Sequence, residues 1–340
     1  MKSKNNFKNI ILISLLLVIL MLFIFEIYAF YIVQTSEKAT IPPNFGNFER
    51  VRNLLKDCTE EFSFALAGDI NGRGTFEKIC RNLREEPLSF MVILGDAVRK
   101  PTYGYHRFFK LQLQKELSLP FPTFYVAGNH DVDKKNFTVN DFEKDYGPTN
   151  FSFEYGNCLF IVLRIIGKPF STDESLKFLE DTLKKSKGKY RKTFLFFHIP
   201  PPVSNDFFSK HYENQWELMA LINDYKVDYV ATGDYHGYAR VKVKNTNYLI
   251  TGGGGSHLRD MKFGNFHHAI VIKVGENSIS ERILAADRVN EFEDGVERYV
   301  IAEYYPWVKN NLFLFLIFNI GILLFLLGLL WKFFTGRIYK

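Results

Sequence analysis

Side chains of the types that bind metal ions stand directly after five short apolar runs of this chain. The five polar segments are Gly68-Asp69-Ile70-Asn71, Gly95-Asp96, Gly128-Asn129-His130-Asp131, His198-Ile199-Pro200-Pro201 and Gly233-Asp234-Tyr235-His236. Buried carboxylates and imidazoles gathered in one place are costly unless a cation neutralises them. Because open α/β sheets bind ligands at the carboxyl ends of their strands, we expect the five segments to converge on one metal-binding cleft.

Each segment alone has an ordinary structural explanation. Gly-Asp after a strand is a common turn, Asn129 is a suitable helix cap, and a lone histidine such as His198 is more often a structural group. Five such segments in series, each after an apolar run, favour a metal site over five unrelated turns.

The elements that must position these side chains follow from the hydrophobic pattern. Short apolar runs predict buried strands at residues 62–67, 90–94, 123–126, 193–197 and 229–232. Amphipathic stretches at 76–85 and 105–117 predict helices between the first three strands, which is the pattern of βαβ units with a parallel sheet. Further on, we predict a hairpin at 151–155 and 159–163, helices at 172–187 and 215–225, and strands at 240–243, 248–251 and 268–274.

In order and spacing, the series resembles the calcineurin-like metallophosphoesterases over roughly residues 62–257. The family pattern is Asp-x-His, Gly-Asp, Gly-Asn-His-Asp/Glu, a later His and Gly-His-x-His, each after a strand. Gly128-Asn129-His130-Asp131 is the most specific match, and the glycine run at 252–255 also resembles a family segment. The resemblance implies an α/β fold, a four-layer αββα sandwich, whose strand-end loops hold two metal ions.

The resemblance also implies a role for each matching residue. Asp96 would bridge the two ions, Asp69 and His236 would hold the first, and Asn129 and His198 would hold the second. His130 corresponds to the histidine that donates a proton to the leaving oxygen or steadies the developing charge, and Asp131 would orient it.

Two positions depart from the family pattern. Asn71 stands where the first site normally has a histidine, and Asp234 stands where the first His of Gly-His-x-His binds the second ion. This oxygen-rich set favours Mn²⁺ or Mg²⁺, with Mn²⁺ first, and also admits Fe or Zn²⁺. The additional carboxylate lowers the net positive charge offered to phosphate, so reduced activity is one expectation.

The implied activity is that of a metal-dependent phosphohydrolase. Two ions about 3.5–4 Å apart lower the pKa of a bridging water and clamp the phosphoryl oxygens of a phosphomonoester, phosphodiester or pyrophosphate. The substrate would be a phosphorylated small molecule or a lipid-linked one. The alternative is a degenerate relative that acts as a binding or scaffold module. We favour the enzyme, since the residues for a two-metal site are retained.

Both ends of the chain are apolar enough to cross a membrane. Residues 10–33, interrupted only by Glu26, and residues 312–331 can each span a hydrocarbon core of about 30 Å at about 1.5 Å per residue. A cleaved signal peptide is the alternative for the first run, but its apolar region is normally shorter and small residues follow it. We therefore expect a retained anchor.

The net charge of +6 lies entirely in the tails 1–9 and 332–340, and the middle of the chain is neutral. A neutral middle excludes nucleic acid as the main partner, because binding to phosphates requires a surplus of Lys and Arg. Basic tails are retained in the cytoplasm, so we expect two membrane spans with both termini cytoplasmic and the domain between them outside. Three cysteines, Cys58, Cys80 and Cys158, are too few for a disulfide framework, although one bridge is allowed.

These expectations divide the chain into seven parts. They are a basic tail (1–9), a transmembrane helix (10–33), a linker (34–50), the metallophosphoesterase domain (51–300), a juxtamembrane segment (301–311), a second transmembrane helix (312–331) and a basic tail (332–340).

Overall fold

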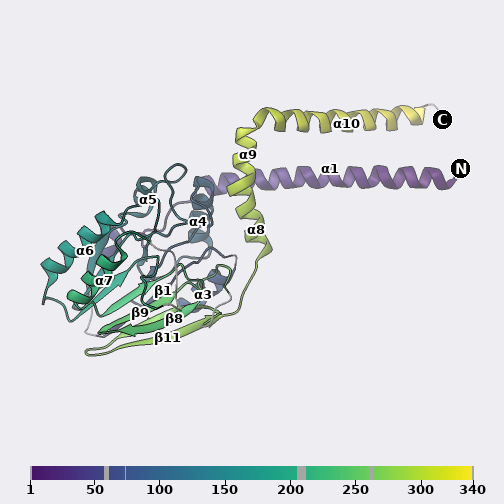
Figure 1. Cartoon of the computed structure of the whole chain (residues 1–340). Coiled ribbons are helices and arrows are strands. Elements are labelled where there is room, and N and C mark those ends of the chain that lie inside the picture. Colours follow the sequence, from purple (N-terminus) through teal and green to yellow (C-terminus); the bar gives the residue numbers. More distant parts are fainter. Residues whose placement is uncertain (1, 57–60, 73, 205–211, 260–263, 339–340) are drawn as a thin grey trace. The chain divides into compact units, whose positions relative to one another are not determined.

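A computed structural model describes residues 2–56, 61–72, 74–204, 212–259 and 264–338 of the chain (Figure 1). The chain divides into two compact units. Unit 1 comprises Met1–Lys38 and Val296–Lys340, and unit 2 comprises Ala39–Gly295. All the predicted site residues belong to unit 2.

The elements of unit 2 alternate along the chain between strands and helices. In order they are α2 (Glu49–Arg52), β1 (Phe62–Ala67), α3 (Thr75–Leu83), β2 (Phe90–Ile93), α4 (Tyr103–Lys115), β3 (Thr123–Tyr125), α5 (Val139–Tyr146), β4 (Phe151–Tyr155), β5 (Cys158–Val162), α6 (Asp173–Ser186), β6 (Lys192–Phe196), α7 (Gln215–Asp224), β7 (Tyr229–Thr232), β8 (Tyr238–Val243), β9 (Thr246–Thr251), β10 (His267–Val274) and β11 (Ile279–Ala286). The helix α8 (Phe292–Tyr299) begins in unit 2 and ends in unit 1.

The strands form two sheets. The first has the order β11-β10-β1-β2-β3, and the second has the order β4-β5-β6-β7-β9-β8. Strands β1, β2 and β3 are parallel to one another, as are β5, β6, β7 and β9. Within each sheet, the carboxyl ends of these parallel strands therefore meet at one edge, which is where the polar segments begin.

Aromatic side chains fill the space between the two sheets. Phe64 of β1 stacks on Phe90 of β2 with ring centroids 4.8 Å apart, and Phe160 of β5 stacks on Phe194 of β6 at the same distance. Phe64 also meets Phe194 edge to face at 5.5 Å, which joins one sheet to the other. A single buried cluster contains all four rings, so the sheets pack face to face.

Helices cover the outer faces of the sheets. Leucines of α6 and α7, such as Leu179 and Leu218, are buried against Ile161 and Leu195 of the second sheet. On the other side, α3 packs against β10 and β11 of the first sheet. The predicted α/β fold with four layers is therefore confirmed, and each strand and helix predicted within unit 2 occurs within two residues of its expected limits.

Unit 2 also contains elements that the sequence did not predict. Strand β11, an edge strand, pairs antiparallel with β10, and α5 begins with a capping box formed by Thr138 and Asp141. Residues 40–47 had been expected to be part of a linker. Instead Phe45 is buried and bridges Thr123, while the Asn47 side chain donates to the carbonyl of Tyr125. Proline and glycine made this segment resemble a linker, but its apolar and amide side chains attach it to β3.

Two of the three cysteines can be placed. Cys80 and Cys158 are buried, and no disulfide joins them. Cys58 lies outside the described residues.

Unit 1 contains the two apolar segments. It comprises α1 (Lys2–Glu37), the C-terminal part of α8, the π-helix η2 (Val300–Tyr304), α9 (Tyr305–Asn310) and α10 (Leu312–Ile338). Within this unit, Phe25 meets Tyr304 edge to face with ring centroids 5.4 Å apart. The spans Ile10–Glu37 and Leu312–Leu329 are long and apolar enough to cross a membrane.

Candidate metal centre

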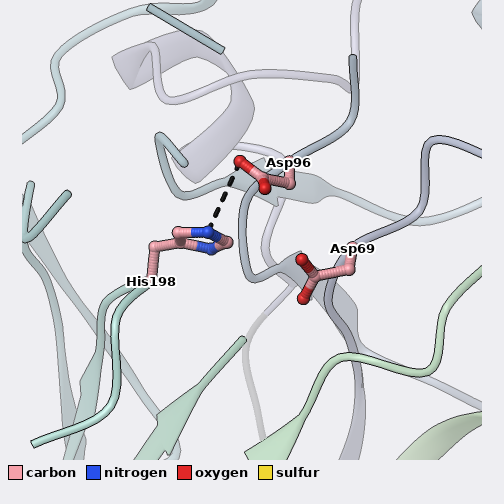
Figure 2. Close-up of side chains that lie close together, drawn as sticks. All are labelled: Asp69, Asp96 and His198. Carbon is pink, nitrogen blue, oxygen red and sulfur yellow. Dashed lines mark ion pairs between the residues drawn. The ribbon is translucent and has the colours of Figure 1, made fainter. Parts of the chain in front are cut away.

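Three side chains from different strand ends converge in unit 2. Asp69 follows β1, Asp96 follows β2 and His198 follows β6. Their side chains point toward one another, and one ligand atom from each lies within 4.8 Å of the others (Figure 2). All three residues are buried, so the group is closed to bulk water on most sides.

The backbone turns sharply where three of the aspartates stand. Asp69, Asp96 and Asp234 have φ angles of 56°, 55° and 59°, which lie in the left-handed region. Such conformations persist only where the surrounding structure holds them, and they are frequent at functional sites. Each of these residues follows a glycine, and the turn brings its side chain toward the cluster.

Two glycines allow the chain to pass against the carboxylates. A Cβ atom on Gly128 would lie 2.2 Å from Oδ1 of Asp96, and a Cβ on Gly252 would lie 2.6 Å from Oδ2 of Asp69. No larger residue fits at these distances without displacing the carboxylate. The glycine run at 252–255 is thus partly a wall of the site.

The ring of His198 presents a nitrogen to the carboxylates. Its Nδ1 donates to the carbonyl oxygen of Leu94 at 2.7 Å, so the tautomer leaves the lone pair on Nε2. Nε2 lies 3.4 Å from Oδ1 of Asp96 and 3.7 Å from Oδ1 of Asp234. This buried nitrogen has no hydrogen-bond partner among the described residues.

His236 is held in the same way. Its Nδ1 donates to the carbonyl oxygen of His257 at 2.7 Å, and its Nε2 lies 3.2 Å from Oδ1 of Asp69. Oδ1 of Asp69 is buried and accepts no hydrogen bond from any residue that the structure describes. A carbonyl partner on one ring nitrogen is the usual arrangement for a histidine whose other nitrogen binds metal.

The charges of the cluster call for a cation. Burial lowers the pKa of His198, but the carboxylates of Asp96, Asp69 and Asp234 outweigh burial and raise that pKa to about 10. For Asp69, burial disfavours the charged carboxylate and raises the pKa. The negative field and the unpartnered atoms of Asp69 and His198 together fit a divalent metal ion, which binds as a Lewis acid where protons would otherwise bind.

Asp131 supports the loop that carries Asp96. Its Oδ2 accepts from the backbone N–H groups of Asp96 at 2.8 Å and Gly128 at 2.7 Å, and its Oδ1 accepts from Val98 at 3.2 Å. Burial and the charge of Asp96 raise its pKa to about 6. The resemblance implied that Asp131 orients His130, whereas the structure shows it fixing the backbone of the Asp96 loop.

A backbone carbonyl orients His130 instead. Nδ1 of His130 donates to the carbonyl oxygen of Arg99 at 3.0 Å, and Nε2 then lies 4.0 Å from Oδ2 of Asp96. The backbone N–H of His130 donates to Oδ1 of Asp96 at 2.8 Å. The side chain is 51% exposed, so His130 is the most accessible of the histidines around Asp96.

The remaining predicted residues surround the same group. The Nδ2 atom of Asn71 donates to the carbonyl oxygen of Asp96 at 3.2 Å. The backbone N–H of Asp234 donates to Oδ2 of Asp69 at 2.9 Å. Asn129 is half-buried and directly precedes His130. Both departures from the family pattern, Asn71 and Asp234, therefore lie beside the central aspartates.

The sequence did not predict the groups that hydrogen-bond to the candidate ligands and to their loops. His106 of α4 is buried, donates from Nε2 to the carbonyl oxygen of Asp131 at 2.8 Å and accepts at Nδ1 from Tyr146. Burial lowers its pKa to about 3, so the ring is neutral. No local signal marks His106, and the orienting carbonyls of Leu94, Arg99 and His257 have none, because every residue type offers a carbonyl.

Comparison with known proteins gives one family match. The model of the family described as "Calcineurin-like phosphoesterase" matches residues 44–238 of this chain. The serine/threonine-protein phosphatase CPPED1 of Bos taurus is 25% identical over 221 residues, covering 59% of this chain and 69% of that protein.

Solved structures with similar folds include phosphatases and an anchor protein. A dimetal phosphatase from Danio rerio superimposes with a TM-score of 0.53 at 14% identity, covering 67% of this chain and 97% of that one. The purple acid phosphatase PPD1 of yellow lupin, Lupinus luteus, gives a TM-score of 0.52 at 15% identity, covering 70% and 55%. GAP50, described as the anchor in the inner membrane complex of Plasmodium, gives 0.51 at 12% identity, covering 72% and 95%. At these identities the likeness shows the fold alone.

Proposed function

The chain belongs to the calcineurin-like phosphoesterase family of metal-dependent phosphohydrolases, and on that premise we propose that its buried strand-end cluster hydrolyses a phosphoester with two divalent ions. The observation that carries the proposal is the pair of buried, unpartnered atoms, Nε2 of His198 and Oδ1 of Asp69, on either side of Asp96. Atoms of this kind are costly to bury unless a ligand binds them.

The ligands divide between two ions around Asp96. We assign Asp69, Asn71 and His236 to the first ion, because Nε2 of His236 and Oδ1 of Asp69 lie 3.2 Å apart. We assign His198, Asp234 and Asn129 to the second ion, because Oδ1 of Asp234 lies 3.7 Å from Nε2 of His198. Asp96 contacts members of both sets and serves as the bridge.

His130 serves the leaving group. When bound, two divalent ions polarise the phosphoryl oxygens and lower the pKa of water. The Arg99 carbonyl accepts from Nδ1 of His130, and Nε2 lies on the side of Asp96, so Nε2 carries a transferable proton when the ring is protonated on both nitrogens. His130 donates this proton to the oxygen that leaves, while Asp131 keeps the Asp96 loop in place.

Manganese is the ion that we favour for the centre. Five of the assigned side chains offer oxygen: Asp69, Asp96, Asp234, Asn71 and Asn129. Two offer nitrogen: His198 and His236. A set with more oxygen than nitrogen suits Mn²⁺ or Mg²⁺ better than Zn²⁺. Fe and Zn²⁺ are competitors that metal analysis can distinguish.

The substrate is a phosphorylated compound, and we propose that it is a phosphomonoester, phosphodiester or pyrophosphate on a small molecule or a lipid-linked carrier. The two apolar spans, Ile10–Glu37 and Leu312–Leu329, would keep the enzyme in a membrane. The basic tails would keep both termini in the cytoplasm and unit 2 on the opposite side. Protease protection in intact cells tests this topology, and finding the C-terminus and unit 2 on the same side would contradict it.

A binding or scaffold module is the alternative. The description of GAP50 as an anchor indicates that a protein of this fold can serve such a purpose. The departures at Asn71 and Asp234 would also suit a chain that had lost one ion. The cluster of Asp69, Asp96 and His198 favours the enzyme, because a scaffold has no need of buried atoms without partners.

The test is hydrolysis by the purified full chain in detergent micelles. Phosphomonoesters, phosphodiesters and pyrophosphates would be supplied with Mn²⁺, Mg²⁺, Fe²⁺ or Zn²⁺. We expect at least one class to be hydrolysed with Mn²⁺, and Asp96→Asn to abolish that activity while the exposed control Asp287→Asn retains it. No turnover with any metal, together with fewer than two bound ions, would support the binding module.

A further inference from the structure

A second group of acidic side chains lies in unit 2 and shares no residue with the metal centre. One carboxylate oxygen from each of Glu116, Glu291 and Asp294 lies within 4.8 Å of the others. Glu116 directly follows α4, Glu291 directly precedes α8, and Asp294 lies in the first turn of α8. Together with Glu77 of α3 and Gln112 of α4, these three residues form what we call the acid pocket.

The acid pocket contains buried oxygens that lack a hydrogen bond. Glu77, Gln112 and Asp294 are 4%, 2% and 4% exposed. Within the part of the chain that the structure describes, Oε2 of Glu77, Oε1 of Gln112 and Oδ2 of Asp294 have no hydrogen-bond partner. Nε2 of Gln112 donates to Oδ1 of Asp294 at 2.8 Å, which places the amide beside that carboxylate. Three buried acceptors without donors, one of them a neutral amide, point to a bound cation.

The negative charge of the acid pocket is only partly compensated by protein cations. Nη1 of Arg81 lies 3.6 Å from Oε2 of Glu116, and Nη2 lies 3.9 Å from Oε1 of Glu291. These distances are long for an ion pair, and the Arg81 side chain is half exposed, so the attraction is weak. The guanidinium of Arg84 donates to the backbone carbonyl of Glu116 rather than to its carboxylate. Burial raises the pKa of Glu77 to about 7, and the charges of Asp294, Glu116 and Glu291 add to that rise.

We propose that the acid pocket binds one Ca²⁺ ion through Glu116, Glu291 and Asp294, with Glu77 and Gln112 as its buried neighbours. All five side chains offer oxygen and none offers nitrogen or sulfur as a metal ligand, which selects hard cations. Three carboxylates, each able to bind through one or two oxygens, supply up to six of the six to eight oxygens that Ca²⁺ takes, and water supplies the others. Mg²⁺ fits less well, because it demands a near-ideal octahedron and gives up its water reluctantly.

The ion has a route of entry and a structural consequence. The side chains of Glu116 and Glu291 are 33% and 35% exposed, so the acid pocket opens to solvent on their side. Residues preceding Glu291 are already attached to α3, since the hydroxyl of Thr75 donates to the carbonyl of Val289 and accepts from its N–H. Bound Ca²⁺ would extend this attachment from α3 and α4 to Asp294, after which the chain leaves unit 2 at Gly295.

Calcium binding to the full chain in detergent micelles tests the proposal. Equilibrium dialysis with radioactive Ca²⁺ would be carried out on Asp96→Asn protein, in which the metal centre is disabled. We expect this protein to bind Ca²⁺, and Asp294→Asn in the same background to bind one ion fewer per chain. Glu293→Gln, which removes an exposed acid from the same turn of α8, is the matched control and should bind as much as the parent.

Thermal unfolding of the same proteins provides a second readout. At a Ca²⁺ concentration about 100 times the dissociation constant, the midpoint should rise by roughly 5–10 °C in the parent and in Glu293→Gln. It should not rise in Asp294→Asn. Without Ca²⁺, Asp294→Asn should be no less stable than the parent, because it removes one of four crowded carboxylates.

A second variant guards against misfolding of the first. Glu116→Gln changes a side chain that is one-third exposed and should also lose the Ca²⁺ response. If the Asp96→Asn protein binds no Ca²⁺, the proposal is overturned. It is equally overturned if Asp294→Asn and Glu116→Gln bind as many ions as the parent, since Ca²⁺ would then be held elsewhere. Neither result depends on the hydrolytic activity of the metal centre.

Discussion

The metal centre and the acid pocket both gather carboxylates within unit 2, but they hold them by different means. In the metal centre, Asp69, Asp96 and Asp234 stand on left-handed turns at strand ends, and backbone groups fix the rings of His198 and His236. In the acid pocket, the acids lie on or beside α3, α4 and α8, and two of them are one-third exposed.

We infer from this difference that the type of ligand atom and the rigidity of the backbone that carries it distinguish the proposed reaction centre from the proposed structural site. Mixed nitrogen and oxygen donors on fixed turns hold ions in one geometry, which in-line attack on phosphorus requires. Oxygen ligands on flexible glutamates tolerate the irregular coordination of Ca²⁺, but they cannot hold a substrate and a nucleophile in one fixed geometry. We therefore expect changes in the metal centre to alter turnover, and changes in the acid pocket to alter stability.

The largest effect should come from Asp96→Asn. This change removes the charge of the carboxylate that we assign as the bridge between both ions. Hydrolysis should fall to background and the Mn²⁺ content of the centre should fall with it, as measured by phosphate release and mass spectrometry. Asp294→Asn should leave the rate unchanged, and equal losses in the two variants would erase the contrast between the sites.

His130→Ala should slow turnover by roughly 10²–10⁴-fold without removing metal, because it deletes a proton donor rather than a ligand. The measurement is kcat alongside metal content for the same preparation. Loss of both ions in this variant would show that His130 is a ligand, and the assignment of the proton donor would then be wrong.

Asp131→Asn tests whether the backbone turns are what makes the metal centre rigid. The amide nitrogen of Asn would face N–H groups that now donate to a carboxylate, so the Asp96 loop should loosen. We expect metal affinity to fall by roughly 10–100-fold, as for other residues that support ligands. Excess Mn²⁺ should restore much of the rate. A variant with unchanged Mn²⁺ affinity would mean that the loop is held without Asp131.

Acid should weaken unit 2 through its buried histidines. Burial lowers the pKa of His106 to about 3 and that of His268 to about 4, compared with about 6.5 in the unfolded chain. The unfolded state therefore takes up protons first as pH falls below about 6.5, and stability is lost. At pH 5 each histidine should cost about 2 kcal/mol of unfolding free energy relative to neutral pH.

Denaturant unfolding of the full chain at pH 7 and pH 5 measures this loss. In His106→Gln, the loss of unfolding free energy between pH 7 and pH 5 should be smaller by the contribution of one buried histidine. His257→Gln, at an exposed position, serves as control. An identical pH dependence in wild type and His106→Gln would contradict the buried, neutral state of this ring.

The smallest effect should come from Asn71→His, which restores the usual family residue. The affinity of the first ion site for Zn²⁺ should rise by less than about tenfold relative to Mn²⁺, because imidazole replaces only one of several ligands. Competition between the two ions, followed by metal analysis, measures the change. A variant with unaltered preference would place Asn71 outside the ligand set.

The sequence predicted the sheets well because a buried strand must carry an apolar run, as at 62–67 and 193–197, whichever partners it has. It also predicted the group of strand-end residues, since parallel strands bring their carboxyl ends to one edge. It could not predict that Arg99 rather than Asp131 orients His130, because a backbone carbonyl has no signature in the sequence. The acid pocket was equally invisible, since Glu77, Glu116 and Glu291 lie far apart along the chain with no motif around them.

Metal stoichiometry tests the central claim most directly. The full chain carrying Asp294→Asn, so that the acid pocket does not contribute, would be dialysed against saturating Mn²⁺ and analysed by mass spectrometry. The two-ion centre predicts two Mn²⁺ per chain, both lost when Asp96→Asn is added. One ion or none at saturation, or two ions that survive Asp96→Asn, would contradict it.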